Sequence, residues 1–152
     1  MRKIITITES IIINSNKLKV WNFTQDFNKR NLWDKTILEY KIISKKPRKL
    51  VWLKMKGGIV TTLKYKLCDK PNKTSLKMHD TKSLLIKGGG GSWKYSEKDG
   101  KTIWVQTNSL EIKFEILYFL FGWLIKKELA RNTKKAMQNA RILIEKEIGQ
   151  KR

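Results

Sequence analysis

The sequence predicts an α+β fold in which an antiparallel sheet precedes one long C-terminal helix. The order of the elements supports this prediction. A β-branched run stops at a polar corner and is followed by a short helical segment that ends at Trp33 and Asp34. Residues 37–113 have the pattern of strands separated by turns, and residues 114–149 then follow a helical period.

The N-terminal part of the chain predicts one strand and two short helices. Residues 3–13, KIITITESIII, are rich in β-branched side chains, which favour a strand. The polar residues 14–16 can cap the helix that follows, which carries Trp21. Asp26 then precedes a second short helix that reaches Trp33. This order already favours a sheet with helices gathered at one end.

Six further strand-length segments follow, at residues 37–44, 50–56, 59–68, 74–82, 91–97 and 101–113. Leu76 and Met78 face one way while Lys77 and His79 face the other, and the same alternation places Leu63, Tyr65 and Leu67 on one face. This pattern is typical of an antiparallel sheet with one apolar and one solvated face. We interpret the glycine run at 88–91 as a loose strand connection, because the GxxxxGK[ST] pattern of a phosphate-binding loop is absent.

The C-terminal segment predicts a long amphipathic helix. Residues 114–125, FEILYFLFGWLI, are too apolar for an ordinary loop, and they lead into a periodic segment that Gly149 can terminate. Small side chains, Thr133 and Ala136 among them, line the middle of the apolar face. Either the helix packs very close to the sheet there, or space is left beneath it. The residues that form this face are Ile125, Leu129, Ala136, Ala140, Leu143 and Ile144.

Length and composition predict one domain over residues 1–150. The single Cys68 excludes an internal disulfide and a cysteine-based zinc site. The first residues lack the apolar core of a signal peptide, and no apolar run approaches the roughly 18–20 residues that span a bilayer. We therefore expect a cytoplasmic protein.

The formal net charge of +21 is the outlier of the composition. Lysine outnumbers arginine 28 to 6, so we interpret the charge as a compositional bias with lysine as the default surface residue. Specific phosphate and base recognition favours arginine, and nucleic acid is not the expected partner. The alternative is that the lysine-rich outer face of the sheet binds a polyanion or an anionic membrane. That face would present Lys54, Lys56, Lys64, Lys66 and Lys77.

The chain resembles the START-like superfamily, also called SRPBCC, which includes the birch pollen allergen and polyketide cyclase/dehydratase-like proteins. The resemblance rests on the opening strand, Val20-Trp21, Asp26, Trp33, the hairpin GGGGSWKYSEKDGKTIWVQ and the closing helix. It implies a helix-grip fold: a seven-stranded curved antiparallel sheet wrapped around the long C-terminal helix, with two short helices after the first strand. It also implies a hydrophobic cavity between sheet and helix. Members bind lipids, sterols, hormones or polyketides, and a minority are enzymes.

Two groups of residues are candidates for ligand binding on this resemblance. Inward positions would line the cavity, and the apolar approach to the long helix would form its mouth. The alternative for every one of them is ordinary packing in the core or in the first helical turn. The inward set is Leu63, Tyr65, Leu67, Leu76, Met78, Leu129, Thr133 and Ala136, and the mouth set is Phe119, Leu120, Phe121 and Trp123.

Catalytic signals are weak. His79, the single histidine, is expected on the wet face, and no three-histidine metal site can form. Glu111 and Glu115 flank the end of the last strand and could serve as a base at the cavity mouth, although a surface role is the simpler interpretation. No cofactor or metal is expected. We therefore expect binding or transport of a hydrophobic small molecule such as a lipid or polyketide, with a polyketide cyclase/dehydratase-like enzyme as the alternative.

Overall fold

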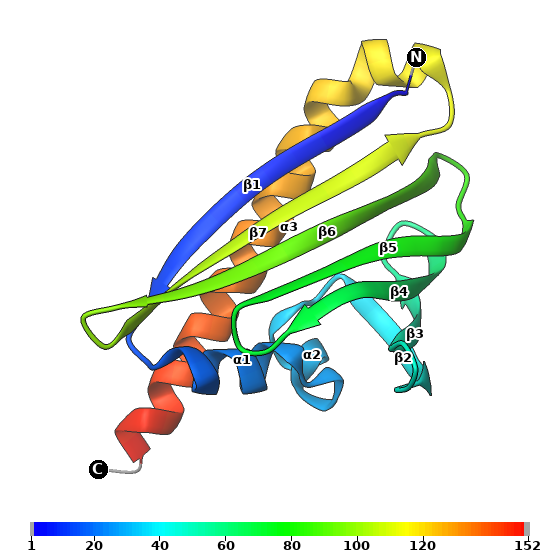
Figure 1. The fold of residues 1–152 in the computed structure, drawn as a ribbon. Helices are drawn as coiled ribbons and strands as arrows, with labels where there is room; N and C mark the ends of the chain where they lie inside the picture. Colours follow the sequence, from blue (N-terminus) through cyan, green and yellow to red (C-terminus); the bar gives the residue numbers. More distant parts are fainter. Residues whose placement is uncertain (1, 151–152) are drawn as a thin grey trace.

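Within residues 2–150, the computed structural model has one seven-stranded antiparallel sheet and three helices (Figure 1). The strand order is β1-β7-β6-β5-β4-β3-β2. This confirms the predicted α+β fold with two short helices after the first strand. The elements are β1 (Ile4–Ile13), α1 (Lys17–Gln25), α2 (Phe27–Trp33), β2 (Ile37–Ser44), β3 (Leu50–Met55), β4 (Ile59–Asp69), β5 (Lys73–Lys82), β6 (Ile86–Lys98), β7 (Lys101–Ile112) and α3 (Glu115–Gln150).

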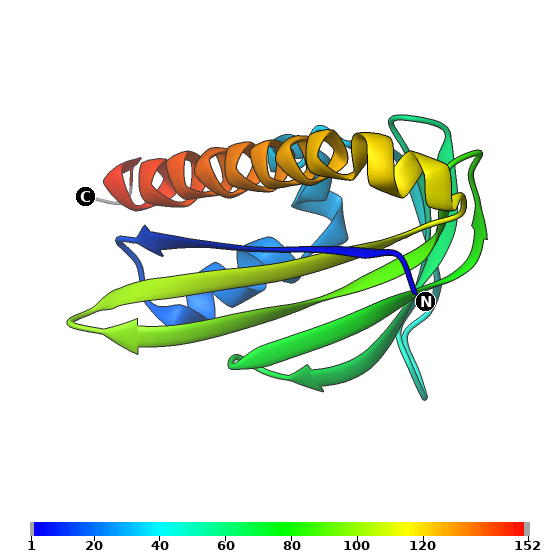
Figure 2. The ribbon, with the colours of Figure 1, turned by 90° about the horizontal axis from the view of Figure 1, so that it is seen from above.

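The sheet curves around α3. The helix lies along the concave side and packs chiefly against β1, while β2 and β3 stand at the far side of the sheet (Figure 2). Helices α1 and α2 close one end and contact the C-terminal half of α3 (Figure 1). In the described part of the chain, no helix is both long and apolar enough to cross a membrane.

The short helices begin where the sequence places their caps. The Asn16 side chain accepts a hydrogen bond from the backbone N–H of Lys19 at 2.9 Å. Asp26 both ends α1 and caps α2, accepting from the N–H of Asn28 at 2.9 Å. These caps satisfy backbone donors that a helix end would otherwise leave unpaired.

The glycine run is part of a strand, so its interpretation as a loose connection was wrong. Gly90 and Gly91 pair with β5 on one side and with β7 on the other. The pairing is too close for side chains: a Cβ at Gly90 would lie 2.7 Å from the Leu76 carbonyl oxygen. The inner face of β6 is therefore bare at Gly89 and Gly91.

The long helix begins earlier than its periodic segment suggests. It starts at Glu115, so the apolar segment 114–125 forms its first turns, and it runs to Gln150, past Gly149. Lys126 and Lys127 mark where an apolar helix becomes an amphipathic one. The first turns extend to the end of the molecule opposite α1 and α2 (Figure 1).

Aromatic side chains fill the core beside α1 and α2. Trp104 is fully buried, and its ring centroid lies 5.6 Å from that of Trp33 and 5.4 Å from that of Trp93. Tyr95 stacks on Trp104 at 6.0 Å, and Trp21 meets the edge of Tyr95 at 5.1 Å. Such contacts add about 0.5–1.5 kcal/mol per pair to the burial of the rings. Trp21 and Trp33 thus hold the short helices against the sheet.

Candidate functional site

The inward residues predicted on β4 and β5 meet in one cluster, with one exception. Leu63 and Tyr65 are buried, and Leu76 and Met78 are half-buried against the same cluster. Leu67 lies beyond a register shift between β4 and β5 and is exposed, apart from the other four. The strand alternation that groups Leu67 with Tyr65 does not register this irregularity.

The residues predicted on α3 face the sheet. Thr133 and Ala136 are buried, and Leu129 is half-buried. Ala136 belongs to the aromatic cluster described above. The small side chains therefore let α3 approach the tryptophans at that level, which is the close-packing alternative of the two that the sequence left open.

The interior packs as three separate hydrophobic clusters. One contains the tryptophans, the second contains Leu63 and Tyr65, and the third joins Ile5, Ile86 and Ile112. Met78 touches both the second and the third, beside the bare stretch of β6. We refer to the inward side chains around this junction as the inner surface: Leu63, Tyr65, Leu76, Met78 and Leu110 on the sheet, and Leu129 and Thr133 on α3.

Two amides on β7 add polar groups to the inner surface. Gln106 is 4% exposed, and its Nε2 has no hydrogen-bond partner among the described residues. Nδ2 of Asn108 donates to Oε1 of Gln106 at 3.2 Å and to Oγ1 of Thr133 at 3.3 Å. We did not single out either amide from the sequence. The available signal was that both share the inward strand positions of Trp104.

Cationic side chains lie over aromatic rings at the α2 end of the interior. Arg30 is 8% exposed, and its guanidinium carbon lies 4.5 Å from the ring centroid of Trp33 and 4.4 Å from that of Trp93. Its Nε donates to Oδ2 of Asp34 at 3.3 Å. Sequence reasoning gave Arg30 no role, because the pattern of a seven-residue helix does not separate one face from another.

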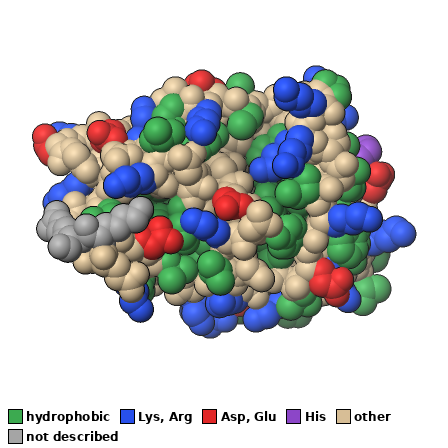
Figure 3. Space-filling view, turned by 90° about the horizontal axis from the view of Figure 1, so that it is seen from below, with side chains coloured by type: hydrophobic (Ala, Val, Ile, Leu, Met, Phe, Trp, Pro, Cys, Tyr) green, Lys and Arg blue, Asp and Glu red, His purple; other side chains and the backbone are tan. Residues whose placement is uncertain are grey.

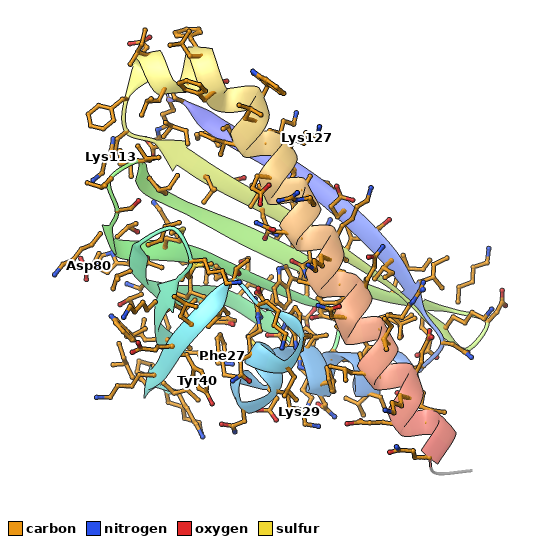
Figure 4. All side chains as sticks on the ribbon, turned by 180° about the vertical axis from the view of Figure 1, so that it is seen from behind. Phe27, Lys29, Tyr40, Asp80, Lys113 and Lys127 are labelled. Atoms are coloured by element: carbon orange, nitrogen blue, oxygen red, sulfur yellow. The ribbon has the colours of Figure 1, made fainter. Side chains whose placement is uncertain are left out.

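Lys49 adds a second cation here. Its Nζ lies 4.9 Å from the ring centroids of both Phe27 and Tyr65 and donates to the Gln25 carbonyl oxygen at 3.3 Å. Burial lowers the pKa of the Lys49 ammonium. Figure 4 shows Phe27 and Tyr40 side by side between α2 and β2, with 5.7 Å between their ring centroids. This end of the interior therefore combines aromatic surface with positive charge.

Acid–base groups are few around the inner surface. Burial raises the pKa of Tyr65 to about 12 and also raises the pKa of Tyr95, so both phenols stay neutral at neutral pH. Glu9 follows the inward positions of β1, opposite Gln106, and lies 3.9 Å from the ammonium of Lys134 on α3. Glu9 is therefore the carboxylate that could exchange a proton beside the two amides.

The residues considered for catalysis from the sequence lie on the surface. His79 is exposed beside Asp80, at 3.4 Å. Glu111 pairs with Lys87 at 3.3 Å, and Glu115 pairs with Lys3 at 3.1 Å. Across residues 2–150, no group of His, Cys, Asp and Glu side chains is arranged to hold a metal ion.

The residues predicted to form a mouth lie on the outer surface. Phe119, Leu120, Phe121 and Trp123 are exposed. They belong to a larger patch that we refer to as the apolar tip: Leu84, Leu85, Phe114, Ile116, Phe119, Leu120, Phe121, Trp123 and Leu124. Between β1 and these first turns of α3 lies an open hollow of about 310 Å³, lined by Ile4, Ile5, Thr6, Tyr118, Phe119, Gly122, Trp123 and Lys126.

Solved structures resemble this arrangement closely. The aromatase/cyclase Zhui from Streptomyces sp. R1128 superposes with a TM-score of 0.78 at 12% identity, covering 95% of this chain and 96% of its own. A START superfamily protein from Mycobacterium smegmatis gives 0.77 at 10% identity, covering 93% and 97%. The chain has the START-like helix-grip fold. This confirms the resemblance at the level of the fold.

TTHA0849 from Thermus thermophilus shows the same START-like fold, with a TM-score of 0.79 at 13% identity over 91% of this chain and 96% of its own. The chain matches no protein-family model and no curated protein. At identities this low, the likeness describes the fold, and function has to be argued from the site.

Proposed function

We propose that the protein binds a hydrophobic small molecule on the inner surface, between the sheet and α3. The observation that carries this proposal is the division of the interior into three clusters, with half-buried apolar side chains at their junction. One domain usually has one contiguous core. An apolar ligand placed against Leu76 and Met78 would join the clusters, gaining roughly 25 cal/mol for each Å² of apolar surface buried.

The ligand we infer also carries an anionic group. Arg30 and Lys49 bring two positive charges to the aromatic end of the interior, and Asp34 pairs with only one of them. A carboxylate or phosphate beside Lys49 would offset the cost of burying its ammonium. A lipid or polyketide acid satisfies both the apolar and the cationic requirement.

A fluorescent fatty acid tests the proposal directly. Titration of delipidated protein should raise the emission of the probe saturably, and Met78→Trp should weaken binding by filling the junction. Tyr65→Ala should also change it, since Tyr65 borders both the apolar surface and Lys49. Lys77→Trp, on the outer face of the same strand, is the matched control and should bind like the wild type. Absence of binding by any apolar probe would reject the proposal.

A second candidate is a cyclase-like enzyme, for which Glu9 is the specific observation. It lies beside Gln106 on the inward side and could relay a proton from an enolisable substrate. The test is turnover of a soluble poly-β-ketone analogue followed by mass spectrometry. Glu9→Gln should abolish turnover, while Glu39→Gln on the outer edge strand should not. Equal turnover by both variants and the wild type would exclude Glu9 as the base.

A further inference from the structure

The apolar tip is a continuous exposed surface. Trp123 is 64% exposed, and Ile116 and Leu120 share its outward side of α3 at helical spacing. The loop between β5 and β6 joins them, because the backbone N–H of Lys113 donates to the Leu85 carbonyl oxygen at 2.8 Å. Leu84 in that loop is 86% exposed. Contiguous apolar surface of this kind on a monomer marks an interaction site.

The charges around the tip decide what it fits. Lys113 precedes α3, and Lys126 and Lys127 follow the apolar turns (Figure 4). The nearby carboxylates are already paired, Glu115 with Lys3 and Glu111 with Lys87. Lysines that border an outward Trp–Leu–Ile face are typical of helices that lie in the interface of an anionic bilayer.

A second copy of the chain is a poorer occupant. Each copy carries a formal net charge of +21, so two tips would meet against long-range repulsion. Figure 3 shows that lysine and arginine side chains are spread over another face of the molecule as well, so the repulsion is not confined to the tip. The same field attracts an anionic surface.

We propose that the apolar tip docks the protein on anionic lipid bilayers, with the outward side chains of the first turns of α3 in the interface and the lysines at the headgroups. Docking does not depend on the inner surface. Met78→Trp should therefore bind vesicles like the wild type, even where it fails to bind the fatty acid. Failure of one proposal is distinguishable from failure of the other.

Vesicle co-sedimentation tests the docking. The wild type should pellet with phosphatidylcholine vesicles that contain phosphatidylserine, and much less with phosphatidylcholine alone. The double variant Leu120→Ser, Trp123→Ser should bind about tenfold more weakly or worse. Both side chains are exposed, so the fold should persist. Ile142→Ser is the matched control: it is 59% exposed on the same helix, away from the tip, and should bind normally.

Charge and depth have their own readouts. Lys126→Glu with Lys127→Glu should weaken binding to acidic vesicles about tenfold or more. Lys135→Glu with Lys146→Glu makes the same change of charge elsewhere on α3 and should weaken it less. On docking, the emission of Trp123 should shift to the blue and resist an aqueous quencher, and the change should vanish in Trp123→Phe.

Three results would overturn the proposal. One is an unchanged affinity of the Leu120→Ser, Trp123→Ser variant for acidic vesicles, which would reduce the binding to net charge. Another is equal binding to neutral and acidic vesicles. The third is a wild-type oligomer that these two substitutions dissociate while no vesicle is bound, which would assign the tip to a second copy.

Discussion

The Asn108 side chain of β7 donates a hydrogen bond to the Thr133 hydroxyl of α3, with 3.3 Å between the nitrogen and the oxygen. The same amide nitrogen also donates to Gln106. This contact ties the sheet to the long helix at the edge of the inner surface. It satisfies the oxygen of the Gln106 amide and leaves the buried nitrogen without a protein acceptor among the described residues.

Replacing Gln106 should therefore stabilise the unliganded protein. Gln106→Met removes a buried donor whose lack of a partner costs about 1–3 kcal/mol, and the free energy of unfolding should rise by up to that amount. Urea denaturation followed by circular dichroism measures it. Gln138→Met, at an exposed site on α3, should change stability little. A loss of stability in Gln106→Met would mean that the amide has an acceptor in solution.

The tryptophan cluster should dominate the stability of the fold. Trp104 has no exposed surface and contacts three aromatic rings, so Trp104→Ala should lower the free energy of unfolding by about 3–5 kcal/mol. Trp52 is half-buried and lies outside the three clusters, so Trp52→Ala should cost less. Chemical denaturation of the two variants compares them. Equal losses would argue against a core centred on Trp104.

Alkaline pH should destabilise the protein through Tyr65. Burial raises the pKa of Tyr65 to about 12, so the folded state holds this proton where the unfolded chain, with a pKa near 10, releases it. The stabilisation is complete below about pH 10 and is lost as the pH rises towards 12. In Tyr65→Phe the slope of unfolding free energy against pH should be shallower there by about 1.4 kcal/mol per unit. An unchanged slope would contradict the burial of the phenol.

The lysine-rich outer face should bind nucleic acid without specificity. Lys64 and Lys77 lie opposite each other on β4 and β5, and any affinity for DNA should fall steeply with salt. Lys64→Gln with Lys77→Gln should reduce it no more than Lys135→Gln with Lys146→Gln does. A fluorescence-anisotropy titration across salt concentrations measures both. Binding that persists at high salt and is lost only in the first pair would instead make this face a dedicated site.

The sequence predicts the fold well wherever local patterns carry the information. The alternation around Met78 and the caps at Asn16 and Asp26 each specify an element without its neighbours. The glycine run could not be placed in this way, because residues without side chains show no alternation and their strand is defined by partners on β5 and β7.

The polar part of the site depended on packing that the sequence does not show. Gln106 and Asn108 occupy inward positions that alternation reserves for apolar residues. Arg30 is buried because it lies over Trp93, a residue far along the chain. The first turns of α3 were ambiguous because a segment that is apolar on every side has no periodic face, so mouth, core and outer surface fit equally well.

Methionine-methyl NMR tests ligand binding at the inner surface most directly. Met78 lies at the junction of two clusters, whereas Met137 is buried in the tryptophan cluster. Titration with a fatty acid should shift the Met78 methyl resonance saturably and more than that of Met137. Trp123→Ser should leave that shift intact, which separates the inner surface from the apolar tip. A fatty acid that binds while the Met78 resonance stays unmoved would contradict the account.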